Sequence, residues 1–287
     1  MSERALLDGV GLRYGVASDV GLVRQVNEDS WLTEPPVFVV ADGMGGHDGG
    51  EIASGLVVEE FARLAAAGYD PRQGSEVVMT ALFAARRRLV EYAATHRGRD
   101  GGPWHGGTTV VAALLVEHDD VPGWLLVNLG DSRIYRLDGG ALRRVSTDHS
   151  VVQELVDAGR ITEEQARSHP ERHIVTRAIG GPDPVDPDLF ALPLAQARRV
   201  LLCSDGVTDL VADPDIEGVL ADEADPRRAA ERIVDLALAE GGIDNATAVV
   251  VDVVGLADAS PDPAGEPGLP GESGEDESSP EKLGDLP

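Results

Sequence analysis

The chain has 287 residues, of which 42% are hydrophobic and 26% charged, so it is long enough for one large or two small globular domains. Its formal net charge of −27 disfavours binding to nucleic acids and anionic membranes, and its single cysteine, Cys203, excludes an internal disulfide and a multi-cysteine zinc site. No apolar run approaches the roughly 20 residues that cross a bilayer, and the N-terminus lacks the layout of a signal peptide, so we expect a cytoplasmic protein without a membrane segment.

Residues 1–255 alternate between short apolar runs and helical periodicity, and we interpret them as one folded domain. Strands are expected at 37–40, 108–116, 124–129, 133–137, 199–203 and 246–254. Helices are expected at 51–67, 75–94, 150–158, 162–168 and 227–240. The connections between the second, third and fourth of these strands are short enough for hairpins. This pattern predicts antiparallel pairing and an α+β protein, not a doubly wound parallel sheet.

The composition changes at about residue 256. Residues 256–287 contain nine acidic residues, one lysine and no aromatic residue, and they are rich in Pro, Gly and Ser. Such a segment buries too little apolar surface to offset the entropy lost on ordering. We therefore expect a disordered acidic tail after the folded domain.

An aspartate stands beside an apolar strand at four points of the chain. Asp42, Asp131 and Asp205 follow predicted strands, and Asp244 stands just before another. A turn explains any one of them, but four converging carboxylates would repel one another unless cations neutralise them. Oxygen ligands favour Mg²⁺ or Mn²⁺, and two such ions can activate a shared water toward a phosphorus or carbonyl centre. Gly43 permits close approach of the backbone, so its carbonyl can join the ligands.

The glycine-rich stretch around the first aspartate, "VVADGMGGHDGG", is not a P-loop, because no lysine and no serine or threonine follows the glycines. An anionic substrate needs a cation, and "VRQVNEDS" supplies Arg24, followed by Glu28 and Asp29. Arginine recognises phosphate with two parallel hydrogen bonds. A solvated arginine in a charged loop explains this stretch equally well.

Three other kinds of hydrolytic chemistry do not fit the sequence. A cysteine phosphatase needs an arginine six residues after the cysteine, where Asp209 stands, and a haloacid dehalogenase nucleophile is replaced by Cys203, two residues before Asp205. The G-x-S-x-G elbow of serine hydrolases is absent. Cys203 is therefore interpreted as a small buried apolar residue, and metal-activated water without a covalent intermediate is the remaining chemistry.

Eight sequence blocks occur in the order found in one protein family, over about residues 12–254: "RQVNEDS", "VVADGMGGHDGGEIAS", "GGTTVVAALL", "NLGDSRIYRL", "TDHSVVQELVDAGRIT", "HPERHIVTRAIG", "LLCSDGVTDLV" and "GGIDNATAVVV". Through these blocks the chain resembles the bacterial type 2C metal-dependent serine/threonine protein phosphatases. The resemblance implies a central antiparallel β-sandwich flanked by helices on both outer faces. It also implies hydrolysis of phosphoserine and phosphothreonine by a dimetal-activated water.

The resemblance assigns roles to particular residues. Asp42 would bridge two Mn²⁺ or Mg²⁺ ions, and the Gly43 carbonyl, Asp205 and Asp244 would complete their ligands. Glu28 would act mostly through metal-bound water, and Arg24 would hold the phosphate. Asp131, together with Asp205, would form a weaker third metal site. The segment at about 151–180 would contain a mobile flap.

The proton donor for the leaving group is not assigned by the resemblance, because the histidine that serves related eukaryotic enzymes has no secure match here. His47 stands in the glycine-rich loop and is our candidate, although a loop imidazole often just binds backbone groups, and a third-metal water is the alternative.

We expect a monomer that dephosphorylates proteins, including serine/threonine kinases. A pseudophosphatase that only binds, and a dedicated phosphatase of an anti-anti-sigma protein, are the alternative functions.

Overall fold

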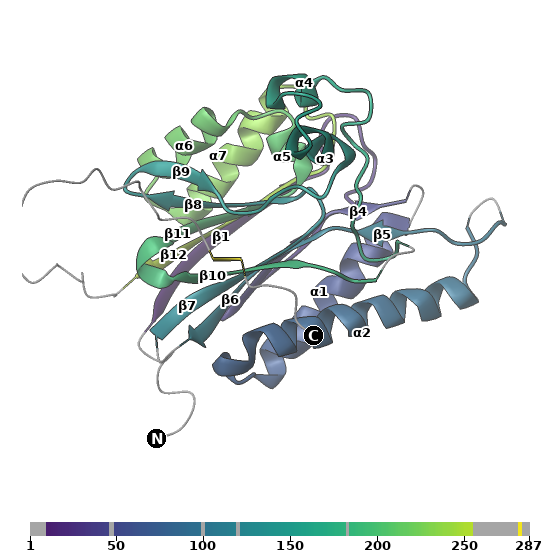
Figure 1. Cartoon of the computed structure of the whole chain (residues 1–287), viewed down its shortest axis with the longest axis horizontal. Helices are drawn as coiled ribbons and strands as arrows, with labels where there is room; N and C mark the ends of the chain where they lie inside the picture. Colours follow the sequence, from purple (N-terminus) through teal and green to yellow (C-terminus); the bar gives the residue numbers. More distant parts are fainter. Residues whose placement is uncertain are drawn as a thin grey trace, which may run out of the picture.

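Two antiparallel β-sheets packed face to face form the centre of the molecule, and helices cover the outer face of each sheet (Figure 1). The computed structural model describes residues 10–45, 49–98, 101–118, 121–181, 184–254 and 281–282. The expected α+β class and the helix-flanked sandwich are both confirmed. Within these described ranges, no helix combines the length and apolarity needed to cross a membrane.

The strands divide between a six-stranded sheet, a five-stranded sheet and a short ribbon. The larger sheet has the order β13-β10-β7-β6-β3-β2, and its strands are β2 (Ser30–Glu34), β3 (Val37–Ala41), β6 (Val110–His118), β7 (Val121–Leu129), β10 (Asp188–Pro193) and β13 (Glu281–Lys282). The smaller sheet has the order β1-β12-β11-β8-β9, and its strands are β1 (Gly11–Asp19), β8 (Arg133–Asp138), β9 (Ala141–Arg144), β11 (Arg199–Cys203) and β12 (Ala246–Val254). The ribbon pairs β4 (Gly43–Met44) with β5 (Gly107–Thr108).

Each sheet has its own set of helices. The pair α1 (Gly49–Ala67) and α2 (Gly74–Thr95) covers the larger sheet, with the 3₁₀ turn Pro71–Gln73 between them. Helices α5 (Asp205–Thr208), α6 (Asp213–Asp222) and α7 (Pro226–Ala239) cover the smaller sheet. Helices α3 (Val151–Asp157) and α4 (Glu163–Arg167) lie in the long connection before β10, and the 3₁₀ turn Leu194–Gln196 follows that strand. All five predicted helices are present, whereas α5 and α6 were not predicted.

Strand β3 is buried on both faces, which explains why it reads as an uninterrupted apolar run. Val37, Val39 and Ala41 belong to the layer under α1 and α2, whereas Phe38 and Val40 belong to the layer between the two sheets. Side chains alternate along a strand, so a strand with a hydrophobic layer on each side needs an apolar residue at every position. The sandwich thus has three apolar layers.

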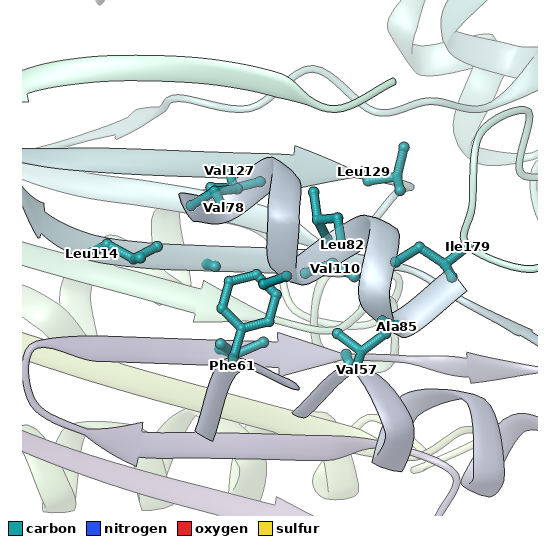
Figure 2. Packing of buried hydrophobic residues seen from close by; sticks show 14 of the residues in the cluster. Val57, Phe61, Val78, Leu82, Ala85, Val110, Leu114, Val127, Leu129 and Ile179 are labelled. Atoms are coloured by element: carbon teal, nitrogen blue, oxygen red, sulfur yellow. The ribbon is translucent and has the colours of Figure 1, made fainter. Parts of the chain in front are cut away.

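The layer under α1 and α2 combines apolar residues of those helices with apolar residues of the larger sheet (Figure 2). Phe61 of α1 and Leu82 of α2 have no exposed surface and pack over the strands of the larger sheet. Burying each such side chain contributes roughly 1.5–3 kcal/mol to folding. The sheet edge that carries the functional residues is therefore held by a close-packed scaffold.

The predicted hairpin between residues 124–129 and 133–137 is wrong. Strand β7 pairs with β6 and β10 in the larger sheet, whereas β8 pairs with β11 and β9 in the smaller one. The three-residue link crosses from one sheet to the other through Gly130, whose φ of +120° favours glycine. A short connection is compatible with either a hairpin or a sheet crossing, so its length alone does not distinguish them.

Most of the predicted disordered tail lies outside the described residues. Glu281–Lys282 are the exception, because they pair as β13 with Phe190 and Ala191 of β10. The edge of β10 offers backbone groups with which an added strand can pair.

Close contact between α7 and β1 provides a test of this architecture. A Cβ added at Gly15 would lie 2.1 Å from the Arg227 Cα, so any side chain there must push the helix off the sheet. We expect Gly15→Ala to lower the free energy of unfolding by about 1–3 kcal/mol or more. The control is Gly218→Ala within α6, where nothing lies within 4 Å of the added Cβ.

The control should stabilise the protein by about 0.5–1 kcal/mol, because alanine favours the helix. Urea denaturation of both variants measures the two effects. Equal effects of the two substitutions would contradict the tight packing of α7 on β1.

Candidate metal centre

The strands of both sheets end at one edge of the sandwich, and their polar ends line a single pocket of about 640 Å³. Asp42 follows β3, Asp131 stands between β7 and β8, Asp205 follows β11, and Asp244 precedes β12. The described lining residues are Arg24, Glu28, Asp42, Gly43, Met44, Gly45, Thr109, Asp131, His173, Ile174, Val175, Asp205, Ile243 and Asp244. The structure thus brings together every predicted site residue except His47, which lies outside the described residues.

Hydrogen bonds from the neighbouring strand hold the backbone of Asp42. Its carbonyl accepts from the Thr109 N–H at 2.9 Å and from the Thr108 hydroxyl at 2.9 Å, and its N–H donates to Thr109 Oγ1 at 3.2 Å. Ser132 Oγ lies 2.8 Å from the same Thr109 Oγ1, which links this strand end to the loop of Asp131. The Asp42 side chain is therefore placed by a fixed backbone.

Asn245 ties the loop of Arg24 and Glu28 to the start of β12. Its amide nitrogen donates to the carbonyls of Val20 at 2.9 Å and Val26 at 3.0 Å, and its amide oxygen accepts from the Glu28 N–H at 2.9 Å. Because Asn245 follows Asp244 directly, one side chain sets the distance between the loop and that aspartate.

The glycines beside Asp42 permit close contact between three backbone segments. A Cβ added at Gly43 would lie 2.3 Å from the Gly50 carbonyl oxygen and 2.5 Å from that of Glu28. The Gly50 N–H donates to Glu28 Oε1 at 3.2 Å, so the first turn of α1 holds this carboxylate. The glycine-rich loop therefore serves close packing around the carboxylates.

Arg24 lies at the rim of the pocket with its guanidinium 2.6 Å from Asp244 Oδ2. Burial lowers the pKa of Arg24, but the hydrogen bond and charge of Asp244, with the charge of Glu28, outweigh this and raise it. The side chain of Arg24 is 49% exposed, so its remaining N–H groups face the pocket opening and solvent. A fixed and exposed guanidinium of this kind suits an anionic ligand.

The carboxylates of the pocket repel one another. Burial, followed by the charges of Asp205 and Asp29, raises the pKa of Asp42 well above its usual range. Burial and the charge of Asp205 raise the pKa of Asp131 in the same way. Burial and the charge of Asp209 raise the pKa of Asp205 to about 6.

Divalent cations fit this set of donors. Burial, first of all, and the charges of neighbouring aspartates raise the pKa values of Asp42 and Asp205, and a bound cation would offset that repulsion. The donors are all oxygens, from four aspartates, Glu28 and the backbone, which suits Mg²⁺ or Mn²⁺. These residues therefore fit a metal centre of hard cations.

Asp29 lies near the carboxylates of the pocket and was not predicted as a functional residue. It is 8% exposed, accepts a hydrogen bond from Ser204 Oγ at 2.8 Å, and leaves its Oδ1 without a hydrogen-bond partner. Burial raises its pKa to about 7, against the lowering effect of hydrogen bonds from Thr247 and Ser204.

The sequence analysis missed His173, which lines the pocket, and Asp209, which lies beside it. His173 Nδ1 lies 3.4 Å from Asp209 Oδ2, and the donor atoms of His173, Asp205 and Asp209 all lie within 4.8 Å of one another. Asp209 is placed four residues after Asp205, where one helical turn brings both side chains to the same face. The four-residue spacing could have identified Asp209 from the sequence. For His173 the sequence offered only its position in the flap segment.

Comparisons with known proteins agree with this geometry. Residues 23–240 match the family described as protein phosphatase 2C. The chain is 41% identical over 244 residues to the serine/threonine protein phosphatase PstP of Mycobacterium tuberculosis, covering 85% of this chain but 45% of that protein. The chain therefore spans about half the length of this relative.

Two solved structures are similar over nearly their whole length. The serine/threonine phosphatase Stp1 from Staphylococcus aureus is 33% identical, with a TM-score of 0.76 over 85% of this chain and 96% of its own. The catalytic domain of PstP in complex with two manganese ions is 39% identical, with a TM-score of 0.71 over 85% of this chain and 99% of its own.

The repulsion between the carboxylates has a measurable effect on stability. Because folding raises the pKa of Asp29 to about 7 and of Asp205 to about 6, the folded protein binds more protons than the unfolded chain between about pH 4 and 7. The extra bound protons therefore stabilise the folded state at the acidic end of this pH range. This contribution is lost as the pH rises through the range. We expect the Tm of EDTA-treated protein to fall between about pH 5 and 7.5.

Two variants separate this effect from general titration. Asp205→Asn should flatten the fall in Tm, because it removes one of the raised groups and relieves its neighbours. The control Asp235→Asn, on the exposed face of α7, should keep the fall. Mn²⁺ at pH 7.5 should restore the Tm of the unmodified protein by binding the folded state. A Tm that rises over this pH range in EDTA would contradict the electrostatics described above.

Proposed function

The chain belongs to the protein phosphatase 2C family, and from this premise we propose that it hydrolyses phosphoserine and phosphothreonine in proteins with the help of Mn²⁺ or Mg²⁺. The observation that carries the proposal is the convergence of Asp42, Asp131, Asp205 and Asp244 in one pocket with Arg24 at its rim. A set of carboxylates beside an exposed guanidinium suits metal-assisted attack on a phosphate.

We assign the metals to the oxygen donors of the pocket. Asp42, the Gly43 carbonyl, Asp205 and Asp244 would hold two core ions, with Glu28 acting through water, and Asp131 with Asp205 would hold a third. When bound, such ions lower the pKa of water and polarise the phosphoryl oxygens. The manganese ions in the PstP catalytic domain support this choice of metal.

The protein's own groups bind and orient the phosphorylated residue. Arg24 would donate two parallel hydrogen bonds to phosphoryl oxygens, and its ion pair with Asp244 keeps the guanidinium at the pocket rim. Holding the phosphate in one orientation lowers the entropy cost of the reaction. The loop that carries Arg24 is tied to β12 by Asn245, so substrate binding and the metal ligands share one rigid support.

The leaving alkoxide of serine or threonine needs a proton, and we propose two imidazoles for it. His47 is the candidate from the sequence and lies outside the described residues. His173 lines the pocket and pairs with Asp209, which would orient its ring. Proton donation of this kind contributes typically about 10²–10⁴-fold to the rate.

We propose that the substrates include serine/threonine kinases of the same cell. The support is the segment of about residues 151–180, which contains α3 and α4 and contributes His173, Ile174 and Val175 to the pocket wall. A protein substrate would meet this segment on entering the pocket, so the segment would contact residues beyond the phosphate.

Metal dependence is the first test. We expect hydrolysis of p-nitrophenyl phosphate and of a phosphothreonine peptide to require added Mn²⁺ or Mg²⁺. Asp42→Asn should lower turnover by more than about 100-fold, because it removes a charged carboxylate that would bind the core ions. The matched control Asp235→Asn, an exposed aspartate of α7, should keep full activity.

Strong activity in excess EDTA would contradict the proposal, and absence of Mn²⁺ binding in calorimetry would favour a pseudophosphatase. The same assay on a phosphorylated kinase and on a phosphorylated anti-anti-sigma protein separates the two cellular roles. A faster rate on the kinase is the expected result.

The proton donor can be identified from the dependence on the leaving group. p-Nitrophenolate leaves without protonation, whereas the threonine alkoxide does not, so loss of the donor should slow only the second reaction strongly. We expect either His173→Gln or His47→Gln to lower kcat on the phosphothreonine peptide by about 100-fold, with little change on p-nitrophenyl phosphate. Equal losses on both substrates would show that the substituted histidine has a structural role instead.

A further inference from the structure

A second groove adjoins the catalytic pocket. It has a volume of about 390 Å³ and lies between α2, the strand β5 with the residues before it, and residues 175–181. Met44, Gly45 and Val175 line both cavities, so the two share a wall at the ribbon β4 and the flap segment. A substrate polypeptide that places its phosphorylated residue in the catalytic pocket therefore passes beside this second groove.

The lining of this groove is largely apolar and is held in place. Leu89, Val90 and Ala93 of α2 form one side, and Trp104 forms another. Trp104 is held by an edge-to-face contact with Tyr92, with ring centroids 5.2 Å apart. Val90 is 59% exposed, which is unusual for a valine on a helix that packs against the core.

Backbone hydrogen bonds fix the opposite side of the groove. The Thr108 N–H donates to the Ile179 carbonyl at 2.9 Å, and the Ile179 N–H donates to the Thr108 carbonyl at 3.0 Å. This pair attaches the end of the flap segment to β5. The groove is therefore preformed on the side that faces the flap.

The charge of the groove differs from that of the rest of the chain. Among the described residues that line it, none carries a carboxylate, and Arg177 and His105 are the ionisable ones. Arg177 lies 3.4 Å from Asp186 and 3.5 Å from Asp188, so its charge is partly neutralised. In a protein with a net charge of −27, a lining without a carboxylate among its described residues adds no repulsion of its own toward an anionic phosphoprotein.

We propose that this groove binds an apolar side chain of the phosphoprotein substrate, a few residues away from the phosphorylated one. The inference rests on the proposed phosphatase function and assigns the groove to that same substrate. An extended peptide advances about 3.3 Å per residue, so a side chain two to four residues from the phosphate reaches a neighbouring cavity. The groove would select among phosphoproteins, whereas Arg24 and the metal ligands would bind the phosphate common to all of them.

Peptides with a single leucine test the proposal. Phosphothreonine peptides of serine and alanine would each carry one leucine, placed in turn from the fourth residue before to the fourth after the phosphothreonine. We expect leucine at one or two positions on one side to raise kcat/KM by about tenfold or more, as an apolar group does in an apolar pocket. Hydrolysis of p-nitrophenyl phosphate serves as the reference, because it has no flanking residues.

Two variants remove the groove in different ways. Val90→Glu places a charge on its exposed side, and Trp104→Ala removes one wall. Both should abolish the preference for leucine and leave the rate on p-nitrophenyl phosphate unchanged. The control is Phe83→Glu, which changes a 51% exposed residue on the same helix that does not line the groove, and it should keep the preference.

The outcomes separate this inference from the proposed function. If the unmodified protein hydrolyses p-nitrophenyl phosphate but shows no leucine preference, or if Val90→Glu keeps the preference, the groove has no role in substrate binding. If the unmodified protein hydrolyses neither kind of substrate with Mn²⁺, the phosphatase function itself is contradicted. Val90 lies on the surface, so its substitution is informative even if Trp104→Ala fails to fold.

Discussion

Repulsion between partly buried carboxylates is the constraint on which the rest of this structure depends. Asp42, Asp131 and Asp205 each have a raised pKa, because burial and the charges of neighbouring aspartates disfavour the ionised form. Side chains free to move would separate and become solvated. They remain together because each belongs to a strand end whose backbone is fixed by a sheet. The sandwich therefore acts as a frame that holds like charges together in one pocket.

Both sheets are needed because neither sheet alone supplies all four aspartates of the pocket. Asp42 comes from the larger sheet, Asp205 and Asp244 from the smaller, and Asp131 from the link that crosses between them. The three apolar layers pack the two sheets against each other and against the helices, which supports the edge that carries the pocket. Short polar contacts, such as the one between the Thr109 and Ser132 hydroxyls, then join the residue before β6 to the link between β7 and β8. Rigidity of this kind is what a metal centre requires of its support.

The sequence predicted the composition of the pocket better than its surroundings. The carboxylates were found because an aspartate beside an apolar strand is a local pattern, whereas their convergence depends on how the two sheets pack. The crossing after β7 was missed because the partner of a strand depends on distant residues. Helix α6 was missed although Ile216, Val219 and Leu220 have helical spacing, because three apolar positions in a short segment are a weak signal. His173 reaches the pocket by tertiary contact alone, which no local pattern encodes.

The charge distribution connects the pocket with the substrate. A phosphoprotein that approaches a chain of net charge −27 is repelled at long range, although salt screens that effect beyond about 8–10 Å. Attraction therefore has to be short-range and local. Arg24 supplies it at the pocket rim, and divalent cations would supply it inside. The acid-free groove beside Met44 and Val175 is the neighbouring surface where a flanking segment meets no carboxylate among the described lining residues. Selection among phosphoproteins would then depend on apolar contact, because the phosphate itself is the same in every substrate.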